Sequence, residues 1–456
     1  MTKSLTKQLS GKREAHRDDA EEEEEEEEDP FGPNHRVWNA NDLFPNDFHT
    51  YLDHQATATA LEAQYDRETA DLNASMEAAC TSKNAPHFPT MAAALITRWL
   101  DFDQPKLDEK MVDFIMIKGT LGLFLRHIHR LPVEVDASDL PSDPLMMLSH
   151  CTPRRVDPDP VKMKQSYNAM ELLCSGTILM SKILAENAEI ILYHIFASLH
   201  PLSGANLHHF RRLLIYFLAN ISNCRDLLLR PHPPHLSHLP LFASRPPPHA
   251  ETAQPSPPLI YWTIPWLHTT SVADAVILYL FPPASRQIEA LWRRERFQTL
   301  HEGGWMKKVF QVLLHPDAST ATVQGTSDFL IRCVEEATDT RDSHLLFQCL
   351  LDEPQLIKQL VAGLRTADVR RKESMVDMLY TFCLRATKQA SVMMPLGDPF
   401  AGKYLLETNE KLKEMLTLHL EGLLLALNGP WQPHVLSDKS ERFFLFLLDP
   451  LCRHDG

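Results

Sequence analysis

The sequence predicts an all-α protein. Glycine is scarce, at 15 of 456 residues, which is about half of its usual share and disfavours a turn-rich β fold. Apolar residues recur at steps of three and four along much of the chain, as one face of an α-helix requires. Runs that alternate between apolar and polar residues are nearly absent. With 44% hydrophobic residues, the chain has ample material for a buried core.

The N-terminal 60 residues are expected to form an acidic tail followed by an arm. Residues 1–29 contain five basic and twelve acidic side chains, and eight consecutive glutamates run from Glu21 to Glu28. Such a block of like charges repels itself and buries no apolar area, so we expect a disordered, solvated tail. A basic surface that binds the tail is the alternative. Residues 30–60 mix aromatic residues with prolines and asparagines, and they predict a loosely docked arm.

Residues 61–230 are expected to form the N-terminal part of a helical domain. The segment 207–228 shows the pattern best, because one apolar face collects Leu207, Phe210, Leu214, Phe217, Leu218, Ile221, Cys224 and Leu228. Six prolines fall within residues 131–163, where few apolar periodicities occur. We therefore expect this interval to interrupt the helices.

A second interruption is predicted at residues 231–258, which hold ten prolines in 28 positions. Proline blocks the helical hydrogen bond and crowds the preceding turn, so no helix is expected here. The segment is interpreted as a disordered insertion. Its three consecutive prolines at 246–248 fit a polyproline II ligand, although a plain spacer is favoured.

The C-terminal part, residues 259–456, is again predicted to consist of helices at short intervals. Ser271 and Asp274 form a capping-box pattern before an apolar run, and Pro354 suits the first turn of a helix because its missing N–H has no partner there. Helical segments are expected near residues 288–300, 305–315, 321–338, 343–351, 354–364, 372–386, 404–428 and 439–449. This succession is typical of antiparallel helix pairs stacked in an irregular HEAT- or armadillo-like solenoid, with ~40–47 residues per repeat. A compact helical bundle is the alternative.

Charge and cysteine usage narrow the classes of partner and compartment. The formal net charge is −15, and the acidic tail carries much of it, so no basic face for nucleic acid is expected. A local cluster of Arg293, Arg294 and Arg296 is a candidate contact point. The eight cysteines include no Cys-x-x-Cys pair, which predicts a reduced cytoplasmic protein, with the nucleus as a second compartment. We expect neither a signal peptide nor a membrane span, since no apolar run approaches the ~18 residues that a span needs.

The sequence predicts no catalytic residue and no cofactor, and hence no enzyme. Gly119-x-x-Gly122 and Gly303-Gly304 lack the lysine that completes a phosphate-binding loop. His150-Cys151 followed by Arg154-Arg155 is close to the loop of a tyrosine phosphatase, which pairs a thiolate with an arginine. The His-Cys-x5-Arg spacing of that loop places Asp157 at the position of the arginine, so we interpret the match as coincidental.

Histidine is abundant, at 23 residues, and a metal site must therefore be considered. His232, His235 and His238 are spaced by three, but they lie among prolines where no helix forms and no further ligand completes a tetrahedral set. His127-x-His129 and His208-His209 are helical neighbours that point in different directions, and we interpret them as surface or helix-end histidines. No metal is expected.

Several segments, taken in order, resemble the SAPS-domain family of phosphatase regulatory subunits. Residues 166–175 are similar to its Tyr-Pro-x-x-Ala-Cys-Glu-hydrophobic-Leu signature, and Leu199-His200-Pro201-Leu202 to its short Pro-Leu turn. Residues 268–274 resemble its Thr-Ser-x-x-Asp helix start. Residues 305–316 followed by 323–331 match its helix, His-Pro turn and next helix, and residues 345–364 also resemble the family.

The resemblance covers roughly residues 80–430 and depends on the order of the segments, since no single motif is specific. Asn168 and Met170 depart from the signature, the acidic extension is unusual, and the insertion at 231–258 interrupts the domain. The chain ends at Gly456, where that family continues with more helices and a long tail. The resemblance therefore describes a divergent member, either minimal or shortened at its C-terminal end.

The resemblance implies a regulatory or scaffold subunit that binds a serine/threonine phosphatase catalytic subunit of the protein phosphatase 6 type and directs it to substrates. Further adaptor proteins remain open as partners. No motif defines the family's interface, so no partner-binding residue is assigned. Basic spots at Arg211-Arg212, Arg293-Arg294 and Arg370-Arg371-Lys372 suit an acidic partner, although a solvated helix face explains each more simply. The alternative is a generic helical-repeat adaptor in trafficking, nuclear transport or complex assembly.

Overall fold

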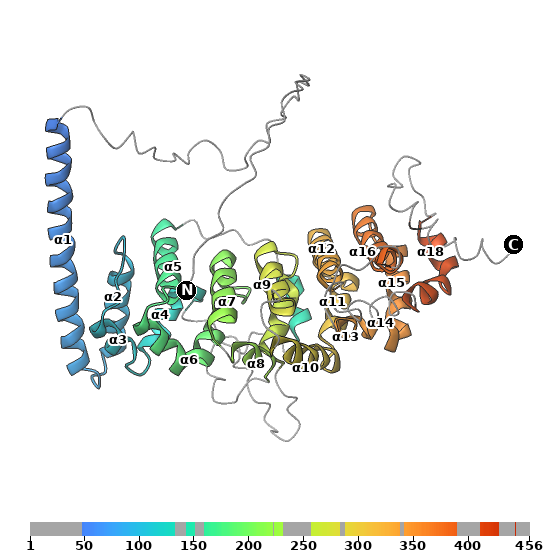
Figure 1. Ribbon diagram of the computed structural model, residues 1–456, viewed down its shortest axis with the longest axis horizontal. Coiled ribbons are helices and arrows are strands. Elements are labelled where there is room, and N and C mark those ends of the chain that lie inside the picture. Colours follow the sequence, from blue (N-terminus) through green and yellow to red (C-terminus); the bar gives the residue numbers. More distant parts are fainter. Residues whose placement is uncertain are drawn as a thin grey trace, which may run out of the picture. The chain divides into compact units, whose positions relative to one another are not determined.

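The computed structural model describes residues 48–132, 143–150, 159–221, 223–230, 257–282, 288–337, 342–389 and 411–427, together with Phe443. Within these ranges every regular element is an α-helix or a 3-10 helix and no strand occurs, so the predicted all-α class is confirmed (Figure 1). The chain divides into two compact units, Met1–Glu68 and Thr69–Gly456. The acidic tail and the proline-rich stretch up to residue 256 lie outside the described residues.

The described part of the first unit is the start of α1 (Phe48–Thr81), a helix that ends in the second unit. Residues 48–60, which the sequence assigned to a loosely docked arm, are helical. The physical reason is local. No proline follows Pro45 in this stretch, and alanine and leucine, which are strong helix formers, recur through residues 56–63.

The second unit begins with the end of α1 and continues through short helices. Leu72 and Met76 of α1 are fully buried in its core. The next elements are α2 (Phe88–Leu100), α3 (Glu109–Ile115), α4 (Thr120–His129), the 3-10 helix η3 (Pro144–His150), α5 (Pro160–Leu173) and α6 (Ile178–Ala197). Three of these helices begin at side-chain caps, because Asp108, Asp159 and Thr177 each accept a backbone N–H of the following turn.

The predicted single helix over 207–228 is wrong in one respect, because the structure divides it into α7 (Leu207–Asn220) and α8 (Cys224–Leu229). Ile221 has extended backbone angles, φ −109° and ψ 109°, so the chain leaves the helix there. The amide of Asn220 donates to the carbonyl of Tyr216 at 2.8 Å, and asparagine competes in this way with helical hydrogen bonds. The apolar stripe continues across the break, which is why periodicity alone did not reveal it.

The middle of the second unit contains η6 (Leu259–Trp266), α9 (Thr270–Leu280), α10 (Ile288–Glu302), α11 (Trp305–Leu314) and α12 (Thr320–Ala337). The predicted capping box is wrong. The residue before α9 is Thr269, so Ser271 and Asp274 already lie within the helix. Both side chains bind residues of neighbouring helices instead, because tertiary partners outcompete the local cap.

The C-terminal helices follow the predicted order with shifted ends. They are α13 (His344–Phe347), α14 (Cys349–Asp352), α15 (Pro354–Thr366), α16 (Val369–Gln389) and α18 (Leu420–Leu427). Pro354 is the first residue of α15, as predicted. The single segment expected at 343–351 is divided at Gln348 between α13 and α14. The described part of the segment expected at 404–428 is likewise divided, by a turn at residues 418–419 before α18. The segment expected at 439–449 lies outside the described residues except for Phe443.

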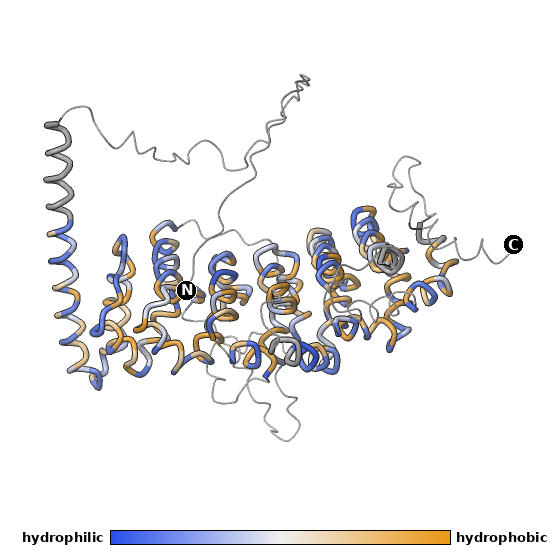
Figure 2. Tube along the Cα trace, viewed as in Figure 1, coloured by the Kyte–Doolittle hydropathy of each residue, from blue (hydrophilic) through white to orange (hydrophobic). Residues whose placement is uncertain are grey.

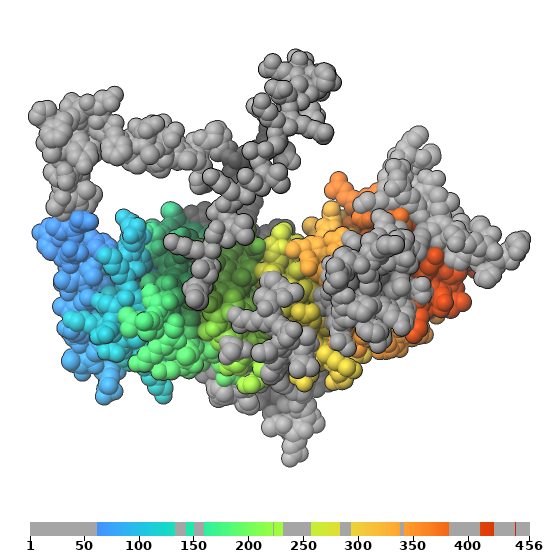
Figure 3. Space-filling model, viewed as in Figure 1, coloured from blue at the N-terminus to red at the C-terminus, as the bar shows by residue number. Residues whose placement is uncertain are grey.

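The helices of the second unit pack beside their neighbours in the chain. In Figure 1, α5, α7, α9 and α12 lie side by side. The contacts between adjacent helices show that they run parallel, since a later residue of one helix always contacts a later residue of the next. Figure 2 shows hydrophilic and hydrophobic residues intermixed along these helices, as amphipathic packing requires. In the space-filling view, successive colours adjoin one another through this unit (Figure 3). Its buried residues form one continuous hydrophobic core.

Close packing at Gly325 gives a first testable prediction. A Cβ at this position of α12 would lie 2.7 Å from both Cα and the carbonyl oxygen of His268, which precedes α9. Gly325→Ala should therefore force the two helices apart and destabilise the protein by about 1–3 kcal/mol, as measured by urea unfolding.

Gly122→Ala is the matched control. Gly122 also lies within a helix, α4, but its added Cβ would meet only His194 Nε2, at an ordinary 3.9 Å. Alanine should be neutral or stabilising there, by up to about 1 kcal/mol. Equal stability of the two variants would contradict the close approach of α12 to His268.

Candidate functional site

Ion pairs link the exposed edges of α5, α7, α9 and α12. Glu171 of α5 forms an ion pair with Arg212 of α7 at 2.5 Å between Oε1 and Nη1. On the next pair of helices, Nε of Arg211 lies 3.2 Å from Oδ2 of Asp274. The other oxygen of Asp274, Oδ1, accepts a hydrogen bond from Nη2 of Arg332 at 2.8 Å. We call these five residues the ladder and the four helices the helix row.

Asp274 has the central place in the ladder. Its side chain is 21% exposed, less than either arginine that it binds. Each carboxylate oxygen is used by a different helix, α7 on one side and α12 on the other. A partly buried carboxylate that binds two guanidinium groups is held more firmly than an ordinary surface pair. The ladder thus fixes the spacing of three successive helices.

Two serine–histidine hydrogen bonds connect the same helices beside the ladder. Ser166 Oγ of α5 lies 2.8 Å from His209 Nδ1 of α7, and His208 Nδ1 lies 3.0 Å from Ser271 Oγ of α9. A serine at hydrogen-bond distance from a histidine is also the geometry of a nucleophile and its base. Ser166 is fully buried, however, so its hydroxyl cannot meet a substrate. This pair joins α5 to α7.

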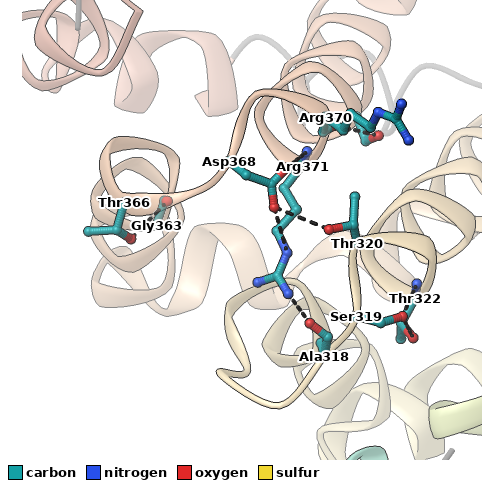
Figure 4. A network of polar contacts seen from close by, with 10 residues as sticks. Ala318, Ser319, Thr320, Thr322, Gly363, Thr366, Asp368, Arg370 and Arg371 are labelled. Atoms are coloured by element: carbon teal, nitrogen blue, oxygen red, sulfur yellow. Dashed lines mark hydrogen bonds and ion pairs between the residues drawn. The ribbon is translucent and has the colours of Figure 1, made fainter. Parts of the chain in front are cut away.

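A further polar network joins α12 to the start of α16 (Figure 4). Asp368 accepts the backbone N–H of Arg371 and the hydroxyl of Thr320, each at 3.1 Å, and its carboxylate pairs with Nε of Arg371 at 3.3 Å. The Arg371 guanidinium also donates to the carbonyl of Ala318. Burial opposes ionisation of Asp368, but the hydrogen bonds from Arg371 and Thr320 and the Arg371 charge outweigh it and lower its pKa.

Four of the basic residues singled out in the sequence serve the fold. Arg211 and Arg212 belong to the ladder, and Arg371 to the network at α16. Arg296 is buried, so it is not a contact point. It donates to the carbonyl of Tyr279 at 2.8 Å, and its guanidinium carbon lies 5.2 Å from the centroid of the Tyr279 ring.

Two arginines of these clusters, Arg294 and Arg370, are exposed. In Figure 4 the side chain of Arg370 points away from the network around Asp368. The sequence grouped Arg370 with Arg371, but adjacent positions on a helix face different directions. One of the two therefore joins helices while the other faces solvent.

The predicted histidine positions are correct in one respect and wrong in another. His127, His129, His208 and His209 all lie in the first or last turn of a helix, as expected. His129 and His209 are buried, however, which the sequence did not predict. Burial, followed by the charges of His208, Arg130 and Arg212, lowers the pKa of His209 to about 4. His232, His235 and His238 lie outside the described residues.

The remaining candidates contribute turns or lie outside the described residues. Gly119 and Gly304 directly precede α4 and α11 with φ of 91° and 69°, a backbone conformation that glycine adopts without strain. His150 ends η3, whereas Cys151 and the arginines that follow it are outside the described residues.

Among the residues that the structure describes, no group of three or more histidine, cysteine or acidic side chains could hold a metal ion. No helix in this part of the chain is long and apolar enough to cross a membrane.

The described cysteines, Cys80, Cys174, Cys224, Cys333 and Cys349, are free thiols. Burial raises the pKa of Cys174 to about 11 and that of Cys224 and Cys349 to about 12. A thiol must ionise to act as a nucleophile or a metal ligand. These three are therefore neutral thiols at neutral pH, with Cys224 and Cys349 in the core and Cys174 packed against it.

Comparisons with models of protein families, with curated proteins and with solved structures find no significant match. One signal in the sequence does point to the ladder, because Asp274 is the single charged residue in the otherwise apolar segment 271–280. A lone carboxylate in such a segment needs a partner from elsewhere in the fold.

The shared carboxylate gives a second prediction. Asp274→Ala removes the acceptor of both arginines and leaves two partly buried charges unpaired, so we expect a loss of about 1–3 kcal/mol in the free energy of unfolding. Urea denaturation measures the loss. Asp103→Ala is the control, because Asp103 pairs with Lys164 at 2.6 Å but is itself exposed. An effect of Asp274→Ala no larger than that of the control would contradict the role of the ladder.

A third prediction concerns the buried histidine of α7. Nuclear magnetic resonance of the protein labelled at histidine Cε1 should give His209 a pKa of about 4, against about 6.5 for an unperturbed histidine. The variant His209→Gln assigns the signal by its absence. A midpoint near 6.5 would show that the ring is not buried against Ser166 in solution.

Proposed function

We propose that this chain is a non-catalytic regulatory or scaffold subunit that binds a serine/threonine phosphatase catalytic subunit of the protein phosphatase 6 type and directs it to substrates. One observation carries the proposal. Three of the segments that resemble the SAPS-domain family contain residues that link neighbouring helices of the helix row. Residues 166–175 contain Ser166 and Glu171, residues 268–274 contain Asp274, and residues 323–331 contain the closely packed Gly325.

We also propose that the helix row is an irregular HEAT- or armadillo-like solenoid. The side-chain links from α5 to α7 join residues 43 and 41 positions apart. From α9 to α12 the separation is 58, and from α12 to the residue before α16 it is 48. Such repeats have about 40–47 residues. The largest separation, 63 between α7 and α9, spans the proline-rich stretch at 231–258, as an insertion within one repeat would require.

The helix row suits a binding surface because the five charged side chains of the ladder are already paired with one another. The ladder holds the helices at fixed spacing, and exposed side chains between its ion pairs are free to contact a partner. Tyr167 of α5 is 47% exposed, and its ring lies 6.1 Å from the ring of His209, which orients it. Tyrosine is enriched among the residues that dominate binding energy at protein interfaces. We therefore assign Tyr167 as an anchor for the phosphatase.

The direct test of the proposed partner is a tagged pull-down of the intact chain from its native cell, followed by mass spectrometry. A serine/threonine phosphatase catalytic subunit should be recovered at close to one copy per chain and be lost from variants that disrupt 166–220. If other proteins are enriched and no phosphatase is recovered, the proposal fails. The adaptor alternative then describes the chain better.

A fourth prediction tests the anchor. Tyr167→Ala should weaken binding of the recovered catalytic subunit about tenfold or more, equivalent to about 1.4 kcal/mol or more, with unchanged unfolding by urea. Ile178→Ala is the matched control, because Ile178 is an apolar side chain that is 90% exposed at the start of α6, outside the helix row. Equal affinities of the two variants, measured by biolayer interferometry, would remove Tyr167 from the interface.

A further inference from the structure

Three helices of the second unit end in the same arrangement, in which an imidazole closes the following turn. His129, the last residue of α4, accepts the N–H of Leu131 on Nδ1 at 3.2 Å. His200 ends the turn that continues α6, and its Nδ1 accepts the N–H of Leu202 at 3.0 Å. His315, directly after α11, does the same with Asp317 at 3.3 Å. Asparagine and aspartate usually close turns in this way. Their side-chain oxygens accept the hydrogen bond throughout the range near neutral pH, whereas an imidazole nitrogen that becomes protonated no longer accepts it.

The turns after α4 and α6 are also joined to each other. Ser203 donates its hydroxyl to the carbonyl of His129 at 2.6 Å, and the N–H of Gly204 reaches the carbonyl of Arg130 at 3.4 Å. The rings of His129 and His194 stack with centroids 5.2 Å apart and an angle of 17° between their planes. We call His129, His194, His200 and Ser203 the histidine joint. The chain leads from this joint directly into α7 of the helix row.

The surroundings of His129 are unfavourable for a positive charge. The residue is 1% exposed, and its Nε2 is buried without a hydrogen-bond partner. Because Nδ1 accepts a hydrogen bond, the ring proton is assigned to Nε2. The pKa of His129 lies well below its ordinary value. Burial is the largest cause, and the charges of His194 of α6, Arg126 and His127 of α4, and His200 lower the pKa further. Burial also lowers the pKa of His127, although the hydrogen bond with Gln165 of α5 and the charge of Asp101, after α2, oppose this effect.

We propose that the histidine joint is an acid-sensitive switch that loosens the ends of α4 and α6 where they lead into the helix row. A proton added to Nδ1 of His129 removes the acceptor of the Leu131 amide. It also places like charges within one buried cluster. The inference concerns the second unit alone and does not depend on the proposed phosphatase partner.

The direction of the effect follows from proton linkage. Histidine in the unfolded or opened chain has a pKa of about 6.5, whereas His129 in the closed joint stays neutral to lower pH. Above about pH 7 the ring is neutral in both states and the joint has its full stability. As pH falls below about 6.5, the opened state takes up a proton at His129 and gains about tenfold in relative population per pH unit.

Hydrogen–deuterium exchange of the full chain at pH 7.5 and pH 5.5 tests the switch, after correction for the chemical exchange rate at each pH. We expect the wild type to lose at least about tenfold in protection at pH 5.5 in peptides covering 120–132 and 200–207. His129→Asn is the informative variant, because its side-chain oxygen can accept the N–H of Leu131 but does not titrate. In this variant the protection of the same peptides should fall by at most a few-fold between pH 7.5 and pH 5.5.

His87→Gln is the control, since His87 is exposed before α2 and should leave the wild-type loss unchanged. His200→Asn removes the charge of His200 that acts on His129, so it should also reduce the loss. The proposal is wrong if the wild type keeps its protection at pH 5.5. It is also wrong if neither asparagine variant reduces the loss, or if neither of them folds at pH 7.5.

Discussion

The arrangement of the helix row depends on the burial of α9 between α7 and α12. Every residue of this helix from Ser271 to Leu280 is buried except Asp274 and Leu278. A carboxylate in such a helix is unfavourable unless it is paired, because removing a charge from water costs far more than one surface contact returns. Asp274 meets that requirement with one arginine from each neighbouring helix. The spacing of the row, and with it the surface that the row presents, follows from this pairing.

The fold class could be predicted from the sequence because helical periodicity and the positions of proline are local properties. Pro354 begins α15 for the reason that its position suggested. The partners of Asp274 could not be predicted, because Arg332 lies 58 residues away and no local rule connects the two. The local rule that does apply, the capping box with Ser271, predicted a different role. The same limit explains His209, whose ring is buried and contacts Ser166 in another helix, 43 residues earlier.

Histidine and glycine at the helix joints show how short-range chemistry and long-range packing are combined. Gly325 lets α12 approach the backbone of His268 more closely than any side chain would allow. His129 and His200 close the turns after α4 and α6 with ring nitrogens. Glycine at such a contact is a steric necessity, whereas the imidazoles make the neighbouring turns dependent on pH. The second unit thus contains both rigid and titratable joints.

We propose that the helix row binds a phosphatase catalytic subunit. Analytical ultracentrifugation of the purified chain mixed with a purified protein phosphatase 6-type catalytic subunit at micromolar concentration tests it most directly. We predict a single complex that contains one copy of each protein. Two species that sediment independently over the whole concentration range would contradict the claim.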